Sequence, residues 1–246
     1  MVRKKQVIAG FNRGAKTYDL AAGLQARVAE RLATKLRDSL PGQVLEIGCG
    51  TGLFSRHLMR KYPAADVLLT DISPSMIAEC REKFSKYPTI KFSCVDGESL
   101  TPAPAYDLIV SSMTLHWFKE FEQSFTRIVQ TLKDRGRFVF AMLSENSLHE
   151  WRAMCQKLNI SPATPSFPTL QSLTRELPDL QLRVETIKEI YPNAFSFLKT
   201  LKSIGAIAPK ADHVPLTPTT MWKLLEHFDH EIEITYEVVY GEYHKL

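Results

Sequence analysis

The stretch "VLEIGCGTG", residues 44–52, places three glycines within five positions directly after a short apolar run. The next residues, "LFSRHLMRKY" at 53–62, have the pattern of a helix. A strand, a glycine-rich turn and a helix together form a site for an anion or a nucleotide. Glycines let the backbone approach the ligand, and the N-terminus of the helix offers unpaired N–H groups. The stretch therefore predicts a ligand-binding turn at the end of a buried strand.

After this turn, apolar strand-like runs alternate with helical segments. The expected strands lie at 44–47, 67–70, 90–96, 106–112 and 136–143, and the expected helices at 53–61, 75–86 and 118–132. Short buried strands linked by amphipathic helices indicate a parallel sheet with crossover connections. Residues 5–40, ahead of the turn, repeat their apolar positions with the period of a helix.

The alternation ends at residue 143, and the rest of the chain is mainly helical. Helices are expected at 144–160, 170–177, 193–206 and 217–228, with a proline-rich loop at 161–169. Two further strands are expected at 182–191 and 232–243. Their half-polar composition is typical of strands at the edge of a sheet.

Composition argues against several classes of protein. The chain has 246 residues, enough to bury a core without disulfides or metals. Its four cysteines are widely spaced with no CxxC pair, so we expect reduced thiols, no zinc site and a cytoplasmic location. The net charge of +4 is too small to indicate a nucleic-acid partner. No apolar run approaches the ~18 residues that a membrane span needs.

Two acidic residues refine the predicted ligand. Asp71 ends the second expected strand, 19 residues after Gly52, near the spacing of a carboxylate that binds ribose hydroxyls. It also precedes Ser73-Pro74, so a cap on the following helix is the alternative. The glycines follow the pattern GxGxG, with Glu46 two residues ahead, whereas GxGxxG makes room for a pyrophosphate. The tighter pattern favours a ligand that is not a phosphate.

Four motifs in this order carry a family resemblance: "VLEIGCGTG" at 44–52, "LTDISPSMI" at 69–77, "VDGESL" at 95–100 and "YDLIVSSMTLHWF" at 106–118. Together they resemble the class I S-adenosylmethionine-dependent methyltransferases. The resemblance implies an α/β fold, a doubly wound Rossmann-like sheet of seven mostly parallel strands whose last strand is antiparallel. It also implies S-adenosylmethionine as the methyl donor and no metal.

The same resemblance implies roles at both ends of the cofactor. Gly48, Gly50 and Gly52 would wrap its methionine part. Ser112, at the end of the fourth strand, would lie near the methyl donor.

At the adenosine end, the resemblance implies that Asp71 holds the ribose, with Ile72 against the adenine. Asp96 would meet the adenine amino group, with Gly97 beside it. An ordinary turn at Asp96-Gly97 is the alternative.

Three segments outside the cofactor core resemble the malonyl-acyl-carrier-protein methyltransferases of biotin synthesis: "FNRGAKTYDLAAGLQ" at 11–25, "MLSENSLHEWR" at 142–152 and "LKTLKSIGA" at 198–206. That resemblance implies methylation of the free carboxylate of a malonyl group held as a thioester on acyl carrier protein. The malonyl methyl ester would prime pimeloyl synthesis for biotin.

The two resemblances divide the chain into three parts. Residues 1–41 would form helices that close over the cofactor, and residues 42–143 the cofactor-binding core. Residues 144–246 would supply helical lid segments and the last two strands. Asp134-Arg135 stands where such relatives often have a Pro-Gly turn, which predicts a turn of different shape.

A carboxylate acceptor needs no general base, because it is already anionic. It must be desolvated and oriented, which favours a phenol together with an arginine or lysine. We predict Tyr18 and Arg152 as this pair, with Arg13 and Lys16 as secondary candidates. His116 is the one candidate base near the fourth strand, and packing beneath the lid is its alternative role.

The implied partner is an acidic carrier protein. The segment "VRKK" at 2–5 and Lys199, Lys202 and Lys210 are candidate contacts for it, although a solvated basic face is the default interpretation. Two rival functions stay open: methylation of a free polycarboxylic acid such as trans-aconitate, and S-adenosylmethionine binding without catalysis. We expect neither a nucleic-acid nor a membrane partner, and the oligomeric state is left open.

Overall fold

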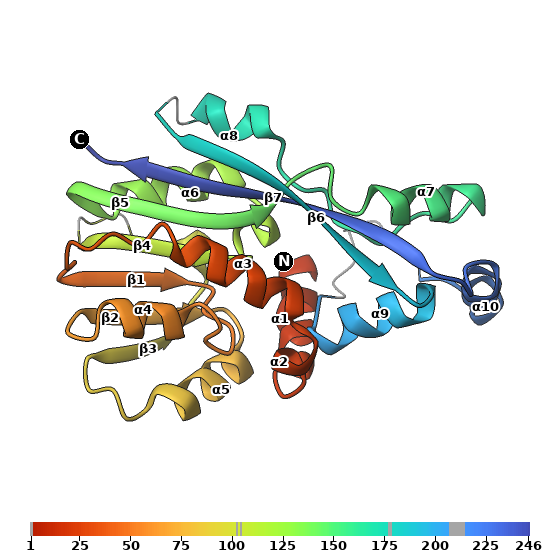
Figure 1. The fold of residues 1–246 in the computed structure, drawn as a ribbon, viewed down its shortest axis with the longest axis horizontal. Helices are drawn as coiled ribbons and strands as arrows, with labels where there is room; N and C mark the ends of the chain where they lie inside the picture. Colours follow the sequence, from red (N-terminus) through yellow and green to blue (C-terminus); the bar gives the residue numbers. More distant parts are fainter. Residues whose placement is uncertain (1, 102, 104, 177–178, 207–214) are drawn as a thin grey trace.

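One mixed sheet lies at the centre of the computed structural model, which describes residues 2–101, 103, 105–176, 179–206 and 215–246. Its strands are β1 (Gln43–Ile47), β2 (Asp66–Asp71), β3 (Ile90–Cys94), β4 (Tyr106–Ser112), β5 (Leu132–Leu143), β6 (Gln181–Tyr191) and β7 (Ile232–His244). Their order is β3-β2-β1-β4-β5-β7-β6 (Figure 1). β1 to β5 pair in parallel, whereas β7 runs antiparallel to both β5 and β6. The predicted seven-stranded sheet with an antiparallel last strand is confirmed.

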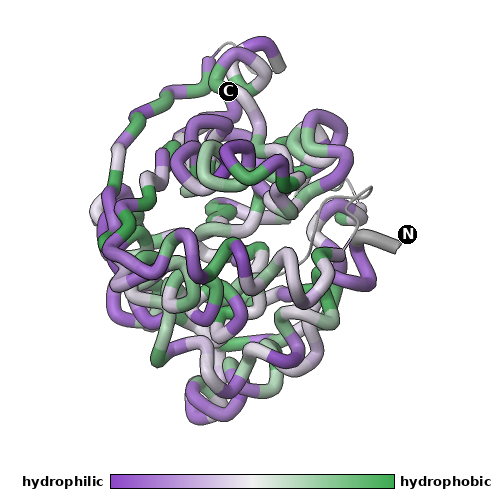
Figure 2. The backbone as a smooth tube through the Cα atoms, turned by 90° about the vertical axis from the view of Figure 1, so that its right-hand side faces the viewer, coloured by the Kyte–Doolittle hydropathy of each residue, from purple (hydrophilic) through white to green (hydrophobic). Residues whose placement is uncertain are grey.

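Helices cover both faces of this sheet. The α-helices are α1 (Val2–Gly14), α2 (Tyr18–Ala21), α3 (Gly23–Ala33), α4 (Ser55–Lys61), α5 (Pro74–Phe84), α6 (Phe121–Gln130), α7 (His149–Lys157), α8 (Leu170–Glu176), α9 (Ala194–Ser203) and α10 (Pro218–His227), with 3-10 turns η1 (Gly97–Ser99) and η2 (Leu115–Trp117). Successive strand residues point to opposite faces. In β4, Leu108 and Val110 join the core beneath α3, α4 and α5, while Ile109 joins the core beneath α6 and α8. The alternation of hydrophobic and hydrophilic residues can be followed along the tube in Figure 2.

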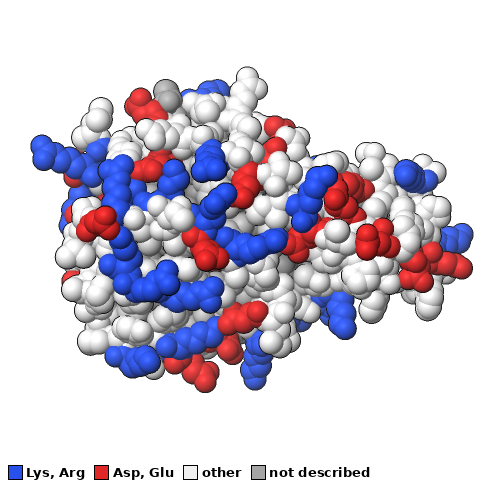
Figure 3. Space-filling model, in the orientation of Figure 1, with Lys and Arg blue, Asp and Glu red and all other residues white. Residues whose placement is uncertain are grey.

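Ion pairs link helix α3 to strand β6, which lies at one edge of the sheet. Arg31 of α3 pairs with Glu185 of β6 at 3.3 Å, and Arg27 pairs with Glu189 one turn away. Acidic and basic side chains are interspersed over most of the face shown in Figure 3.

The last two strands differ from the expectation that both lie at an edge. β6 is the edge strand, but β7 lies inside the sheet between β5 and β6. Its polar residues include Glu242, which is buried and accepts a hydrogen bond from Arg137 at 2.7 Å. A buried and paired carboxylate has the same sequence signature as an exposed one, so the polarity of β7 was misleading.

The connection into β5 also differs from the expectation. α6 spans Phe121–Gln130, so it is shorter at both ends than the expected helix at 118–132, and β5 begins at Leu132, four residues before the expected strand at 136–143. The sequence predicts that the turn at Asp134-Arg135 differs in shape from a Pro-Gly turn. In the structure Arg135 has a positive φ of 61°.

Replacing Arg135 by glycine is therefore expected to stabilise the protein by about 1 kcal/mol, because a side chain in the left-handed region carries a steric cost of that order. Arg135 is exposed, so the change removes no buried contact. Urea unfolding of both proteins, read as a change in midpoint at constant slope, measures the effect. Asp134→Gly removes a neighbouring side chain without that strain and serves as the control; equal shifts in the two variants would contradict the explanation.

Candidate active site at the carboxyl ends of the strands

Two cavities meet where the parallel strands end. The smaller, of about 570 Å³, is lined by α1 and by the segments that follow β1 to β4. The larger, of about 700 Å³, lies between α2, the segments after β5, and helices α9 and α10. Five residues line both cavities: Phe11, Tyr18, Gln25, Met113 and Trp117. We call these five the junction residues, because a ligand in one cavity reaches a ligand in the other only past them.

The three glycines of the turn serve different purposes. Gly48 (φ 72°) lies so close to Thr114, after β4, that a Cβ atom there would overlap its side chain. Gly50 lines the smaller cavity, and a Cβ atom there would meet nothing within 4 Å. Gly52 lies outside the lining of that cavity, and a Cβ atom there would overlap the ring of Phe84 in α5. Gly52 therefore lets α5 pack against the turn, and its predicted contact with the cofactor is not part of the observed lining.

Asp71 faces the smaller cavity from the end of β2. Its Oδ2 accepts a hydrogen bond from the Gly50 N–H at 2.9 Å, and its Oδ1 accepts one from the Ser73 N–H at 2.8 Å. Burial raises the pKa of this carboxyl, and the hydrogen bonds oppose that shift. The cap of α5 is Ser73, whose hydroxyl accepts the Met76 N–H. The alternative role of Asp71 as that cap is therefore wrong, and its carboxylate oxygens keep lone pairs for a ligand. The adjacent Ile72 lines the same cavity.

Glu46 of β1, noted in the sequence beside the glycines without a specific contact, lines the smaller cavity. It is buried, and its Oε2 accepts a hydrogen bond from the Ser55 hydroxyl at 2.7 Å. Its Oε1 is also buried and has no hydrogen-bond partner among the described residues. Burial raises the pKa of Glu46 to about 8, with the charge of Asp71 adding to the rise and the Ser55 bond opposing it. An acidic residue inside a buried strand, two places before the glycines, is the signal that identifies it.

These groups fit S-adenosylmethionine. Glu46 offers an unpaired buried acceptor to an ammonium group, Asp71 offers acceptors to a ribose diol, and the bare backbone of Gly50 leaves room beside them. Ser112 lines the same cavity at the end of β4. The described residues contain no group of three or more His, Cys, Asp or Glu side chains placed to hold a metal ion.

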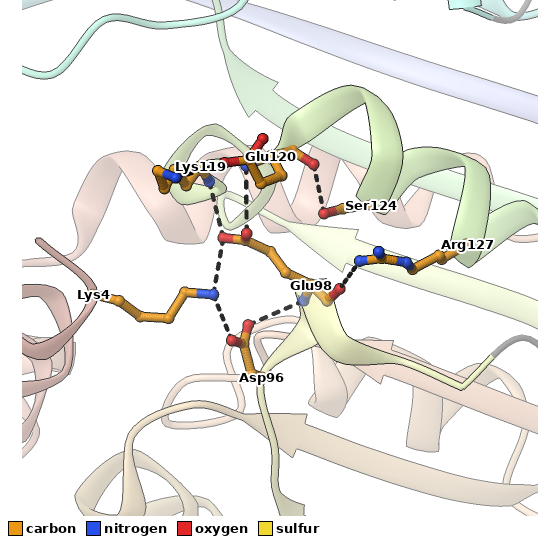
Figure 4. A network of polar contacts seen from close by, with 7 residues as sticks. All are labelled: Lys4, Asp96, Glu98, Lys119, Glu120, Ser124 and Arg127. Carbon is orange, nitrogen blue, oxygen red and sulfur yellow. Dashed lines mark hydrogen bonds and ion pairs between the residues drawn. The ribbon is translucent and has the colours of Figure 1, made fainter. Parts of the chain in front are cut away.

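A network of charged groups, drawn in Figure 4, includes residues that line the smaller cavity. The Asp96 carboxylate accepts the Glu98 N–H at 3.0 Å and pairs with the Lys4 ammonium of α1. Glu98, which is buried, also pairs with Lys4 at 3.3 Å and accepts the Lys119 N–H at 2.9 Å. Gly97 lies between them, where a Cβ atom would come within 2.6 Å of the Ile47 side chain.

Lys4 thus pairs with cavity-lining carboxylates, whereas Lys5, from the same predicted group of carrier contacts, is exposed. The side chains of Val2 and Arg3 lie outside the described part of the chain. Burial lowers the pKa of Lys4, but the hydrogen bond to Asp96 and the charge of Glu98 outweigh that, and the net pKa is raised. Its ammonium links α1 to Asp96 and Glu98 at the lining of the smaller cavity. The contact joins residues 92 positions apart, which no local pattern predicts.

Replacing Lys4 by methionine is expected to speed the release of S-adenosylhomocysteine by about 3- to 10-fold, the effect of losing one partly exposed charged hydrogen bond. Stopped-flow tryptophan fluorescence can follow this release, because Trp117 is a junction residue. Lys5→Met is the matched control, since Lys5 is exposed on the same turn. A slower release in Lys4→Met would show that Lys4 competes with the ligand for Asp96, and an unchanged release would show that its ion pairs do not retain the ligand.

Polar groups at the junction are neutral. Tyr18 stands on α2, and burial, then the charges of Asp71 and Asp19, raise the pKa of its phenol, which keeps its proton. Gln25 and Trp117 add an amide and an indole N–H. His116 lines the larger cavity, where it packs on Phe167 with ring centroids 5.6 Å apart. Its Nδ1 accepts the Leu143 N–H at 3.3 Å.

Arg152 is not brought to Tyr18. Its Nη2 donates a hydrogen bond to the Glu145 carbonyl at 2.8 Å, and it lines neither cavity. The same helix, α7, presents Trp151 and Cys155 to the larger cavity. Arg152 lies off that face of the helix, so the structure does not bring it together with Tyr18 as predicted.

The other predicted cations also lie elsewhere. Arg13 and Lys16 are exposed at the end of α1, and neither lines a cavity. Lys199 and Lys202 are exposed on α9, and Lys210 falls outside the described residues. Among the described residues that line the larger cavity, none is a lysine or an arginine.

Comparison with known proteins places these features in context. A family model described as a methyltransferase domain matches residues 44–136. A malonyl-acyl-carrier-protein O-methyltransferase of Magnetococcus marinus is 34% identical, covering 98% of this chain and 93% of that protein. Another protein of that name, from Ilyobacter polytropus, is 31% identical over 98% of this chain and 97% of its own length.

Solved structures share the fold at low identity. The YcgJ protein of Bacillus subtilis has a TM-score of 0.61 at 15% identity, covering 92% of this chain and 98% of that one. The N-methyltransferase NodS of Bradyrhizobium japonicum, solved with S-adenosylhomocysteine, has a TM-score of 0.52 at 14% identity, covering 90% and 86%. Every helix in the described part of the chain is too short or too polar to span a bilayer.

Proposed function

Because the chain belongs to the malonyl-acyl-carrier-protein O-methyltransferase family, we propose that it methylates the free carboxylate of a malonyl group carried as a thioester on acyl carrier protein. The methyl donor is S-adenosylmethionine, and the product ester primes pimeloyl synthesis for biotin. The observation that supports this most is the meeting of two cavities at the junction residues. A donor in the smaller cavity and an acceptor in the larger one would react there.

The reaction needs alignment and the exclusion of water more than proton transfer. When bound, S-adenosylmethionine supplies a methyl group whose bond to sulfur breaks as a carboxylate oxygen bonds to it, with the electron pair left on sulfur. No proton moves, so the absence of a base among the junction residues fits the chemistry. Holding the two reactants in line contributes about 7–11 kcal/mol in well-oriented systems.

Neutral donors suit this reaction. The attacking carboxylate and the sulfonium carry opposite charges, and both charges disappear in the products. A low-dielectric site therefore does not penalise the transition state. We assign Tyr18, Gln25 and Trp117 to orient the carboxylate, in place of the predicted arginine. Tyr18 keeps its proton to donate because burial raises its pKa.

The three predicted parts of the chain take roles in this proposal. Residues 1–41 cover the cofactor, to which Lys4, Val7, Phe11 and Tyr18 present side chains. Residues 42–143 bind it through Gly48, Gly50, Asp71, Ile72 and Asp96. Residues 144–246 supply the wall of the larger cavity and the strands β6 and β7. We also propose a cytoplasmic location, since the four cysteines are all free thiols.

A basic group beside the larger cavity suits an acidic carrier protein. Thr17, after α1, donates a hydrogen bond to the Ser203 carbonyl at the end of α9, at 2.8 Å. This contact joins the ends of α1 and α9, which carry or adjoin four exposed cations: Arg13, Lys16, Lys199 and Lys202. None of them forms an ion pair with a described residue. We propose that this group contacts the acidic partner.

Mass spectrometry of malonyl-acyl carrier protein, incubated with the protein and S-adenosylmethionine, tests the proposal. Malonyl-coenzyme A, free malonate and trans-aconitate would be treated in parallel. One added methyl group on the carrier-bound malonyl is the expected result. Methylation of the free acids alone would move the function to a small-acid methyltransferase. Cofactor binding without transfer to any acceptor would favour a non-catalytic role.

A further inference from the structure

The larger cavity exceeds what a malonyl group can fill. Its volume of about 700 Å³ is in the range of sites that hold drug-sized ligands. Most of its lining is apolar, with contributions from α7, α9 and α10 such as Trp151, Leu201 and Leu224. A three-carbon acyl group at the junction would leave the outer part of this cavity to another portion of the substrate.

The outer part contains a pair of buried phenols. Tyr191 ends β6 and Tyr236 belongs to β7; both are buried and line the cavity. Their hydroxyl oxygens lie 3.0 Å apart, so one hydroxyl donates to the other. The accepting hydroxyl keeps its own proton to donate, and both oxygens keep lone pairs. The pair therefore offers one donor and several acceptors to a ligand in an otherwise apolar space.

The two tyrosines lie on strands away from β4, after which the junction residues Met113 and Trp117 follow. Tyr236 lies two strands from β4, because the order is β4-β5-β7, and two strand spacings are about 10 Å. It also lies two residues beyond Val238, the partner of Leu143 at the end of β5. An extended malonyl group spans roughly 5 Å from carboxylate oxygen to thioester sulfur at the reach of an extended chain. The malonyl group is therefore shorter than the separation between β4 and the strand that carries Tyr236.

The charged residues in the lining of the larger cavity restrict which kind of ligand it can bind. Glu189 is the single carboxylate among the described residues that line the larger cavity, and Arg27 pairs with it. A free polycarboxylate would bring charge into a space with no described cation in its lining. A long, uncharged and largely apolar chain with a few amide groups fits the cavity better.

We propose that the outer part of the larger cavity binds the pantetheine arm of the thioester substrate, whose second amide hydrogen-bonds to the hydroxyl pair of Tyr191 and Tyr236. This rests on the proposed function, since it takes the acceptor to be a thioester. The arm continues from the sulfur by roughly 4 Å to its first amide nitrogen and roughly 8 Å to its second, at the reach of an extended chain. Apolar side chains such as Leu201 and Leu224 pack on its methylene and methyl groups. The same arm occurs in coenzyme A and on acyl carrier protein.

The double variant Tyr191→Phe/Tyr236→Phe tests this site, because it keeps both rings and removes both hydroxyls. We expect kcat/KM for malonyl-pantetheine to fall about 10-fold, as the loss of one or two hydrogen bonds implies. Malonyl-N-acetylcysteamine, which ends after the first amide, should change less than about twofold. Tyr243→Phe on the same strand is the control, since Tyr243 lies outside the lining. Malonyl-coenzyme A and malonyl-acyl carrier protein, run alongside, show which source of the arm the protein prefers.

Equal losses with both thioesters would place the hydroxyls at the reacting end and overturn the proposal, and so would no loss with either. Binding of pantetheine itself, followed through the fluorescence of Trp151 in the cavity wall, gives a readout that does not require methyl transfer. The wild-type protein should bind it about 10-fold more tightly than the double variant. If methyl transfer fails with every acceptor while this difference persists, the proposed function is wrong and the arm site stands. Equal pantetheine affinities in the two proteins would overturn the site.

Discussion

Replacing Tyr18 by phenylalanine is expected to lower kcat/KM for the malonyl thioester by about 10- to 100-fold, because a hydrogen bond to a charged group contributes roughly 1.5–3 kcal/mol. Tyr18 is a junction residue whose phenol stays protonated, and the variant keeps its ring. The affinity for S-adenosylhomocysteine should change by less than about threefold. Steady-state kinetics with the carrier-bound substrate, together with calorimetric titration of the product, separate the two effects.

Arg152→Ala is the matched comparison for this prediction. Its guanidinium donates to the Glu145 carbonyl and lines neither cavity, so kcat/KM should stay within about twofold of the wild-type value. A large loss in Arg152→Ala with little loss in Tyr18→Phe would reverse the assignment. It would mean that α7 turns during catalysis to bring the arginine to the substrate.

Replacing Glu46 by glutamine is expected to weaken the binding of S-adenosylhomocysteine at pH 8 by at least about 10-fold, since the buried Oε1 loses its negative charge. In the wild-type protein the pKa of Glu46 is raised to about 8, chiefly by burial. The ammonium group of the ligand favours the carboxylate, so binding expels the proton. Affinity should therefore rise by roughly 10-fold per pH unit below pH 8 and level off above it. Calorimetric titrations from pH 6 to 9 measure the profile.

The free protein should show the opposite trend in stability. The folded-state pKa of Glu46 is raised above its ordinary value of 4.5, so the neutral carboxyl is the form that the fold favours. This contribution to stability is complete below about pH 4.5 and is lost as the pH rises towards 8. Glu46→Gln should remove both trends. Ser55→Ala, which deletes the bond that lowers the pKa, should move the inflection in binding to higher pH. If the affinity of the wild-type protein for S-adenosylhomocysteine does not change with pH, the proposed role of Glu46 is wrong.

Local patterns predicted the sheet and the glycine turn because the features they depend on are local. Once β1 and β2 pair in parallel, the position of the glycine turn after β1 and of the Asp71 carboxylate at the end of β2 follows from the pairing. Gly52 belongs to the same motif, but its neighbour is Phe84, 32 residues later in α5. Which glycine meets a ligand and which meets a helix depends on that distant contact.

Arg152 illustrates a second limit. Periodicity predicted a helix around it, and α7 is present. The rotation of α7 about its axis depends on the preceding residues, where Leu148 takes a left-handed conformation with φ of 61°. That conformation is unusual for leucine and leaves no clear mark in the sequence. As a result Trp151 lines the larger cavity, whereas the next residue, Arg152, does not.

The close packing of Gly14 against Gly205 has a kinetic consequence. A Cβ atom on Gly14 would lie 2.6 Å from the Gly205 nitrogen, and one on Gly205 would lie 2.6 Å from the Gly10 carbonyl oxygen. α1, which lines the smaller cavity, and the end of α9, which lines the larger one, are thus in contact backbone to backbone. Moving either one to admit a substrate disturbs the other. Entry and exit at the two cavities should therefore be interdependent events, with an order of addition and release that a rate measurement can establish.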